Sequence, residues 1–350
     1  MQLSREMFDQ QRRPRYGNAN PERMAFAFWE WMIRGDESPS PNEDDRLEKL
    51  GLQLRDGKLK SVYGPFRARD LFQIPTIPEE GPIWTFDRMG ATRNELPDGR
   101  LVCIGGEHED FYDPDFCIYN DVVVFQSDGQ IEIYGYPREI FPPTDFHTAA
   151  LDGERLIIIG GLGYQNERRP GHTPVYALDL RKYQISEIAT SGEMPGWLFK
   201  HEARFDPKGI IEVRGGEFVI EIEGSQLLRR NFEDYALDLG SWVWRRLTHR
   251  NWRQFSIRPG DGGGLFILEK RPNPQALLPR KIQHVVSPCE GTKHARFIVQ
   301  STPISLAIGV ASIEVIIEGN LPKALTARLV EEIRANAAAA TQQECTVEEN

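Results

Sequence analysis

The sequence has few cysteines and none of the short motifs that mark common enzyme classes. Its four cysteines are scattered, without a Cys-x-x-Cys pair, and predict free thiols in a reducing compartment. It contains no Gly-x-Ser-x-Gly, His-Glu-x-x-His, phosphate-binding lysine loop, dinucleotide fingerprint or Cys-His arrangement at useful spacing. Because these motifs are absent, we favour a protein that is not an enzyme. We assign no catalytic residue and expect no cofactor.

Long apolar runs are also missing. No stretch of about eighteen apolar residues occurs, and the first residues lack the apolar segment of a secretory signal. The formal net charge of −10 disfavours general binding to a nucleic-acid backbone and favours a neutral or basic partner. We therefore expect a cytoplasmic protein that binds neither membranes nor nucleic acid.

What the sequence does contain is a threefold repeat. A strand-like apolar run ends in a glycine doublet at residues 105–106, 160–161 and 215–216, so that successive doublets lie 55 residues apart. The central copy reads DGERLIIIGG, in which a turn dipeptide leads into an unbroken apolar run, as in strands buried on both faces. The glycines indicate positive φ or a close approach of two backbones. Tyr-x-Leu-Asp follows at 176–179 and 235–238.

This arrangement resembles the kelch repeat of β-propellers, whose period is about 50 residues. The resemblance covers about residues 84–250 and implies four-stranded blades, with tyrosine or tryptophan filling the space between neighbours. A closed propeller has about four to eight blades. Three clear copies therefore imply either degenerate flanking blades or an incomplete propeller capped by other elements. Kelch is a fold-level label that names no reaction, and the ligand set of kelch copper oxidases is not recognisable in this sequence.

The regions around the repeat suggest how the chain is organised. We predict a mainly β protein with an N-terminal helical segment at 1–60, kelch-like blades at 61–253, a small α+β domain at 254–342 that caps them, and an acidic tail at 343–350. The repeat ceases near residue 254, where separate strands and a clear helix follow.

Two helices are expected in the N-terminal segment, and the second is a short charged one after a loop that follows Gly35. Asn20 as cap and Pro21 as first helical residue begin the first helix, and Gly35 ends it. Its many large apolar side chains predict burial against the propeller or the C-terminal segment. The first twenty residues and the tail are polar and predict little regular structure.

The most conspicuous polar stretch, GEHEDFYDPDF at 106–116, directly follows the first doublet. Three interpretations stay open: a cation site, although the spacing is not that of an EF-hand; an acidic and aromatic contact surface for a basic protein; or a solvated loop. The loop after the second doublet carries arginines that could pair with this acidic loop or extend its surface. The candidate partner-binding residues are Glu107, His108, Glu109, Asp110, Tyr112, Asp113, Asp115, Tyr164, Arg168 and Arg169.

Two histidines and one tryptophan occupy repeated positions and are therefore expected to be structural. His147 and His201 predict hydrogen-bonded side chains near the interface between blades rather than metal ligands. Residues 242–253 interleave tryptophan with arginine, which taken alone suggests a nucleic-acid stacking platform. Trp244 stands where the repeat places its aromatic residue, so the core is the favoured interpretation.

The sequence thus favours a non-catalytic protein-binding module that engages a basic protein through acidic and aromatic loops, for example as an immunity protein or antitoxin-type inhibitor. The alternative is a metal-dependent hydrolase or lyase whose cation is held by the carboxylates of the same loop. A structural adaptor with several simultaneous partners is a third hypothesis.

Overall fold

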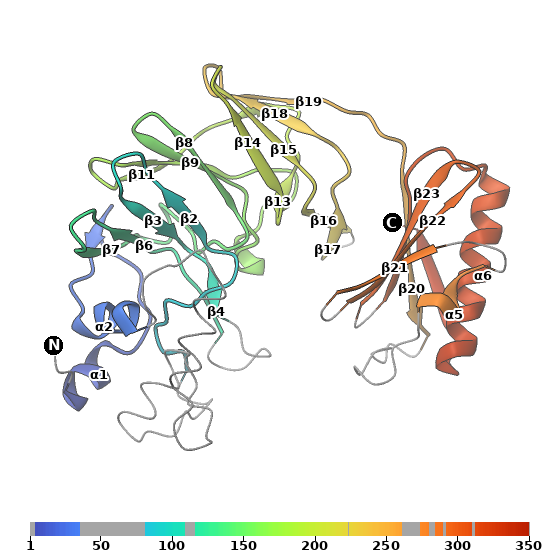
Figure 1. The fold of residues 1–350 in the computed structure, drawn as a ribbon, viewed down its shortest axis with the longest axis horizontal. Helices are drawn as coiled ribbons and strands as arrows, with labels where there is room; N and C mark the ends of the chain where they lie inside the picture. The colour runs from blue at the N-terminus through green and yellow to red at the C-terminus, as the bar shows by residue number, and fades with distance from the viewer. Residues whose placement is uncertain are drawn as a thin grey trace. The chain divides into compact units, whose positions relative to one another are not determined.

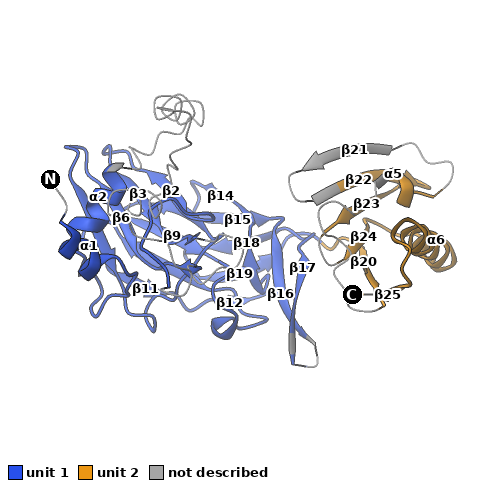
Figure 2. Cartoon of the chain, turned by 90° about the horizontal axis from the view of Figure 1, so that it is seen from below, with its two compact units in different colours: residues 1–248 blue, residues 249–350 orange. Residues whose placement is uncertain are grey.

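The structure is a computed structural model that describes residues 4–35, 81–108, 116–222, 224–260, 274–279, 284–289, 292–309 and 312–349 (Figure 1). The chain divides into two compact units, Met1–Thr248 and His249–Asn350 (Figure 2). It is mainly β, as the sequence predicts, with several antiparallel sheets. Among the described residues, no helix is both long enough and apolar enough to cross a membrane.

Unit 1 contains three antiparallel meanders, one for each copy of the repeat. In every meander the second strand ends at a glycine doublet, and the four strands pair in chain order. The first meander is β2 (Thr92–Glu95), β3 (Leu101–Ile104), β6 (Val122–Phe125) and β7 (Ile131–Gly135); the second is β8 (Thr148–Asp152), β9 (Arg155–Ile159), β10 (Val175–Asp179) and β11 (Ile185–Glu187); the third is β14 (Glu202–Asp206), β15 (Ile210–Arg214), β18 (Tyr235–Asp238) and β19 (Val243–Arg246).

Two of these sheets gain a short extra strand at the outer edge. β1 (Glu22–Arg23) pairs antiparallel with β7, and β12 (Ser191–Gly192) pairs parallel with β19. The loops that follow the doublets carry their own short elements: β4 (Glu107–His108) with β5 (Cys117–Ile118), the 3₁₀ turn η2 (Gln165–Glu167), and the hairpin β16 (Glu217–Ile222) and β17 (Ser225–Arg230), which β13 (Trp197–Phe199) extends to three strands.

The three sheets pack face to face, so the central strands of the second sheet are buried on both sides. Leu156 and Ile158 of β9 contribute to the core between the first two sheets, whereas Ile157 and Ile159 contribute to the core between the second and third. This explains the unbroken apolar run, because alternate side chains of a strand point to opposite faces. Tyr176 lies in the first of these cores and Trp244 in the second, which confirms the predicted burial of Trp244.

The two ends of the stack are finished differently. On the first sheet, α1 (Arg5–Gln11) and α2 (Ala27–Gly35) bury a cluster of aromatic side chains, with Trp29 stacked on Trp84 at 4.7 Å between ring centroids. On the third sheet, the register places Arg204, Glu212 and Arg245 in one row on the face away from the second sheet. A polar outer face is what a terminal repeat needs for solubility. Within the described residues, the sheets do not close into a ring.

Unit 2 is a six-stranded antiparallel sheet with two helices on one face. Its strand order is β21 (His284–Cys289), β22 (Thr292–Val299), β23 (Thr302–Ile308), β24 (Ile313–Ile317), β20 (Arg253–Pro259) and β25 (Cys345–Glu349). Apolar residues of α5 (Pro274–Leu277) and α6 (Lys323–Thr341) share one core with the sheet. This is the α+β arrangement predicted from the end of the repeat.

Three local predictions at the chain ends were wrong. The helix does not begin at Asn20: residues 22–23 form β1, and the Asn20 side chain bonds to both backbone groups of Ile185, at 2.7 and 2.9 Å. The early residues form α1, because Phe8 is fully buried against α2. The acidic tail forms β25, since β20 offers it an open edge. The short charged helix expected after Gly35 lies outside the described residues.

Candidate functional site

The loops that follow the three glycine doublets touch one another at the same end of the sheets. The first contacts the second through Tyr164, whose hydroxyl accepts a hydrogen bond from Ile118 N at 2.9 Å and whose ring meets Phe116 edge-on at 5.9 Å. The second contacts the third where Gln226 Nε2 donates to Gln165 O at 3.1 Å. We call the described parts of these loops, residues 107–108, 116–118, 162–172, 217–222 and 224–230, the doublet-loop face.

The doublets place these loops by bonding each repeat to the next. Gly106 N donates to Thr144 O at 2.8 Å, and Gly161 N donates to Leu198 O at 2.9 Å. Each acceptor lies in the segment that links one sheet to the following sheet, so the backbone must turn sharply against a neighbouring backbone. The first glycine of every doublet has a positive φ, between 57° and 70°. Glycine adopts this conformation without a Cβ penalty.

A guanidinium held between two tyrosines lies beside the face. The Arg138 guanidinium is 5.0 Å from the centroid of the Tyr16 ring and 5.3 Å from that of Tyr164, and its Nε donates to Glu167 at 3.0 Å. The two tyrosine hydroxyls are hydrogen-bonded to each other, and burial raises the pKa of Tyr16 to about 12. These contacts therefore hold the three side chains in place against one another.

Two carboxyl groups meet beneath the same loops. Glu107 and Asp145 are 7 % and 0 % exposed, and their side chains are hydrogen-bonded to each other. Burial raises the pKa of Asp145, while a 2.7 Å bond from Gly163 N and the charge of Arg168 oppose that rise. Two carboxyl groups can share a hydrogen bond only when one carries a proton. The Glu107 carboxyl therefore joins the first loop to the segment that links the first two sheets, and it does not face solvent.

The other predicted binding residues are distributed as follows. His108 is half-buried in β4. Arg168 Nε and Nη2 donate to the carbonyls of Leu162 and Gly163, whereas Arg169 is exposed and pairs with Glu187 of β11 at 2.8 Å. Arg169 thus bonds to its own sheet. Glu109, Asp110, Tyr112, Asp113 and Asp115 lie outside the described residues.

The two repeated histidines hold neighbouring sheets together, as predicted. His147 Nε2 is 3.0 Å from Thr92 Oγ1, and His201 Nε2 is 2.8 Å from Thr148 Oγ1, so each histidine bonds to the first strand of the preceding sheet. Burial lowers the pKa of His147 to about 3 and that of His201 to about 4, and both are therefore neutral at pH 7. In the part of the chain that the structure describes, no group of three or more His, Cys, Asp or Glu side chains could hold a metal ion.

Sequence reasoning missed a buried ion pair in the first sheet. Arg88 Nη2 donates to Asp121 Oδ2 at 3.0 Å, Trp84 Nε1 donates to the same oxygen at 2.9 Å, and the guanidinium lies 3.5 Å from the centroid of the Tyr119 ring. Both charged side chains are under 5 % exposed. Burial alone would lower the pKa of Arg88, but the Asp121 carboxylate raises it. The only sign of this pair in the sequence is the position of Arg88. It begins RMGAT at 88–92, which stands at the same place in its repeat as the segments that contain His147 and His201.

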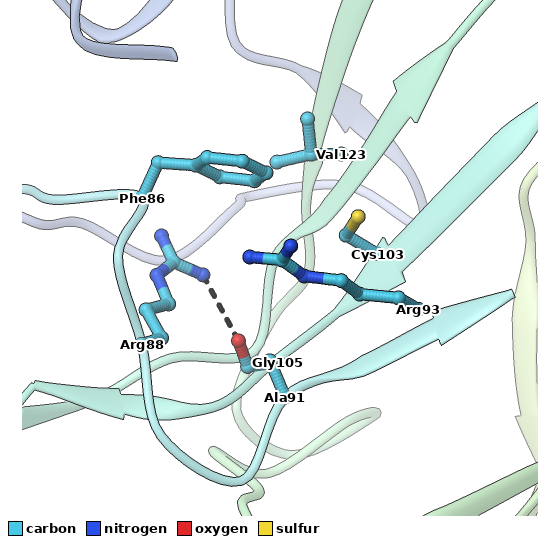
Figure 3. Close-up of a pocket in the computed structure, with 7 residues that line it drawn as sticks. All are labelled: Phe86, Arg88, Ala91, Arg93, Cys103, Gly105 and Val123. Atoms are coloured by element: carbon cyan, nitrogen blue, oxygen red, sulfur yellow. Dashed lines mark hydrogen bonds between the residues drawn. The ribbon is translucent and has the colours of Figure 1, made fainter. Parts of the chain in front are cut away.

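A small pocket adjoins this ion pair (Figure 3). It is lined by Phe86, Arg88, Ala91, Arg93, Cys103, Gly105 and Val123. The free thiol of Cys103 is buried, and burial raises its pKa to about 11, so it is not a reactive thiolate at pH 7. Cys117 and Cys345 are free thiols as well, as the scattered cysteines predict, and both are buried.

Comparison with known proteins gives little similarity. No protein-family model matches the chain, and no curated protein matches it. Among solved structures, a fungal alcohol oxidase of the AA5 family in complex with copper is similar over 76 % of this chain and 73 % of that chain, with 10 % sequence identity and a TM-score of 0.29. At that score the similarity supports no conclusion about fold or activity.

Proposed function

We propose that this protein is a non-catalytic binding module whose doublet-loop face engages a basic protein partner. The observation that carries the proposal is that the loops of all three repeats contact one another, through Tyr164 and Gln226. Three separate loops would present three small surfaces, whereas adjoining loops present one. Stable protein interfaces need about 800 Å² from each partner, and one continuous surface fits that need better.

The proposed architecture is an incomplete kelch-like propeller of three blades. Three observations support it: the doublets recur at one spacing, the four strands of each sheet follow one another in order, and neighbouring sheets share tyrosine or tryptophan in their cores. The helices on the first sheet and the charged row on the third would take the place of further blades. In such a scaffold, loops carry the function and sheets hold them in place.

The expected partner is basic because of the charge at this face. Four carboxylates of the first loop, Glu109, Asp110, Asp113 and Asp115, lie in the chain between β4 and β5, and the whole protein carries a formal net charge of −10. Attraction of this kind raises association rates and selects partners of opposite charge. The cluster of Tyr16, Tyr164 and Arg138 adds the residue types that most often dominate binding energy. An immunity protein or antitoxin for a basic toxin is one function of this class.

The test is a matched pair of charge variants. In the first, Glu109, Asp110, Asp113 and Asp115 are changed to their amides. In the control, four exposed carboxylates at the opposite ends of the sheets are changed in the same way: Glu95, Asp98, Asp128 and Glu154. Both variants lose four negative charges, so the change in net charge is the same. Circular dichroism establishes that each is folded.

Affinity capture from native lysate identifies the partner, and calorimetry with the purified partner measures its affinity. We expect the loop variant to bind at least about tenfold more weakly than the control, since each lost charged contact costs roughly 1 kcal/mol or more. Equal affinity of the two variants would refute the proposed face. Saturable heat from titration with Mn²⁺ or Ca²⁺, lost in the loop variant, would instead favour the hydrolase or lyase alternative.

A further inference from the structure

Several strand edges in this protein are covered by another segment of the chain, but the edge of β17 is not. β1 pairs with β7, β12 pairs with β19 and β25 pairs with β20. On β11, the Asn20 side chain bonds to both backbone groups of Ile185. β17 is the last strand of the sheet that it forms with β13 and β16, and no segment that the structure describes pairs with its outer edge. Figure 2 shows the hairpin of β16 and β17 projecting from unit 1.

The hydrogen-bond pattern of the hairpin determines which backbone groups lie at this open edge. Asn231 N donates to Gly216 O at 2.9 Å, directly beyond the last pair of the hairpin. Bonded and non-bonded pairs alternate along an antiparallel ladder, so Leu227 and Arg229 also bond to β16. The residues between them direct their N–H and C=O groups away from β16. These residues are Gln226, Leu228 and Arg230.

An apolar row crosses the three strands and ends at the same edge. Trp197 of β13 pairs with Val219 of β16, which pairs with Leu228 of β17. Trp197 and Val219 belong to one hydrophobic cluster and are 6 % and 1 % exposed, whereas Leu228 is 48 % exposed. A further strand with an apolar residue opposite Leu228 would continue this row, and cross-strand apolar pairs stabilise a sheet.

The edge of β17 is complementary to the same edge of a second copy. Two β17 strands can lie antiparallel across a two-fold axis with Leu228 opposite Leu228 of the second copy. Gln226 of each copy then lies opposite Arg230 of the other, and all outward backbone groups meet a partner. Charged residues at an edge often prevent such pairing. In this register no two arginines are opposite each other, and Arg230 also pairs with Glu217 of its own sheet.

We propose that two copies of this chain associate through β17, so that the three strands of each copy join into one antiparallel sheet. A two-fold dimer uses the same surface on both copies, as the pairing of Leu228 with itself requires. Each β17 has six residues. Strands of that length bury less than the roughly 800 Å² that each partner contributes to a stable interface, so the dimer should be reversible.

This inference does not depend on the basic partner proposed above. β17 belongs to the doublet-loop face, but the acidic residues that test the basic partner, Glu109, Asp110, Asp113 and Asp115, lie in a different loop. Loss of the dimer and loss of the basic partner are therefore separate results, obtained with different variants.

The first test is sedimentation velocity of the full-length protein over a wide range of concentrations. Leu228→Lys is compared with Leu247→Lys, because Leu247 is exposed to the same extent, 47 %, and lies outside β17. We expect wild type and Leu247→Lys to dimerise equally. Leu228→Lys removes the apolar pair and places like charges opposite each other, so it should weaken dimerisation at least about tenfold. A monomeric wild type, or equal dimerisation of the two variants, would overturn the proposal.

The second test is a mixing experiment that separates loss of pairing from loss of folding. Leu228→Lys and Leu228→Glu should each dimerise weakly when alone. An equimolar mixture should form dimers, because opposite charges then meet across the axis. Mixing does not rescue a misfolded protein, so no gain of dimer in the mixture would contradict the proposed register.

The third test locates the interface by hydrogen exchange of single backbone amides. With increasing protein concentration, the amides of Gln226, Leu228 and Arg230 should exchange more slowly. Those of Leu227 and Arg229 bond to β16 in every molecule and should be protected at all concentrations. Dimerisation without this alternating change would show that another surface forms the dimer.

Discussion

The change Gly160→Ala tests why the first position of a doublet requires glycine. Either the next repeat lies too close for a Cβ atom, or only the positive φ requires glycine. At Gly160 φ is 70°, and an added Cβ would lie 2.2 Å from Leu198 O. At Gly215 φ is 62°, and an added Cβ would meet nothing within 4 Å, because no further repeat follows. The two positions share a backbone conformation and differ in their surroundings, so Gly215→Ala is the matched control.

The expected costs follow from that difference. A left-handed conformation costs an alanine roughly 1–2 kcal/mol, and a smaller entropy of the unfolded chain returns about 0.4–1 kcal/mol. Gly215→Ala should therefore lower the free energy of unfolding by about 1 kcal/mol. At Gly160, Leu198 O must also move by about 1 Å to restore an ordinary contact. It is the oxygen that accepts from Gly161 N. Overpacking adds about 1–3 kcal/mol, for a total of about 2–4 kcal/mol.

Urea denaturation followed by tryptophan fluorescence measures both variants. Of the seven tryptophans, only Trp252 lies in unit 2, so the fluorescence reports mainly on unit 1. We expect the Gly160→Ala midpoint to fall clearly below that of Gly215→Ala, with similar slopes. Equal midpoints would refute the explanation that the first glycine of the doublet accommodates the next repeat.

Two further changes test buried polar groups. The low pKa of His147 and His201 means that the unfolded chain binds protons below pH 6.5 that the folded chain does not, so stability should fall as pH drops toward about 4. The wild-type free energy of unfolding should fall between pH 7 and pH 5, and His201→Gln should reduce this fall by about 2 kcal/mol. Urea denaturation at both pH values measures the difference. An unchanged pH dependence in the variant would contradict this explanation. Asp121→Asn leaves the buried Arg88 without its counter-charge and should cost about 3–5 kcal/mol. In a thermal-unfolding cycle, Arg88→Gln with Asp121→Asn should cost less than the sum of the single changes; additivity would argue against a coupled pair.

The repeat could be predicted because its causes are local. A strand buried on both faces needs consecutive apolar residues, and a positive φ needs glycine, so β9 and its doublet are visible in ten residues of sequence. The aspartate of Tyr-x-Leu-Asp is local too: Asp179 accepts hydrogen bonds from the backbone N–H groups of Arg181 and Lys182 in the following turn. The structural role of His147 and His201 followed from repetition alone.

The candidate sites depended on contacts between distant residues. Glu107 looked like one of several exposed carboxylates, but the segment that links the first two sheets places Asp145 against it. This arrangement has no signal at short spacing in the sequence.

The sequence by itself determined the mainly β class, the three similar sheets and the positions of their sharp turns, because burial and backbone conformation act residue by residue. Tertiary structure decided what covers the outer faces of the stacked sheets: helices on the first sheet and a polar row on the third. It also decided which charged groups are buried together, namely Arg88 with Asp121 and Glu107 with Asp145. It also turned the polar tail into β25, since an unpaired strand edge stabilises any segment that can reach it. A charged side chain can be buried only beside a partner, and the fold alone determines where that partner lies.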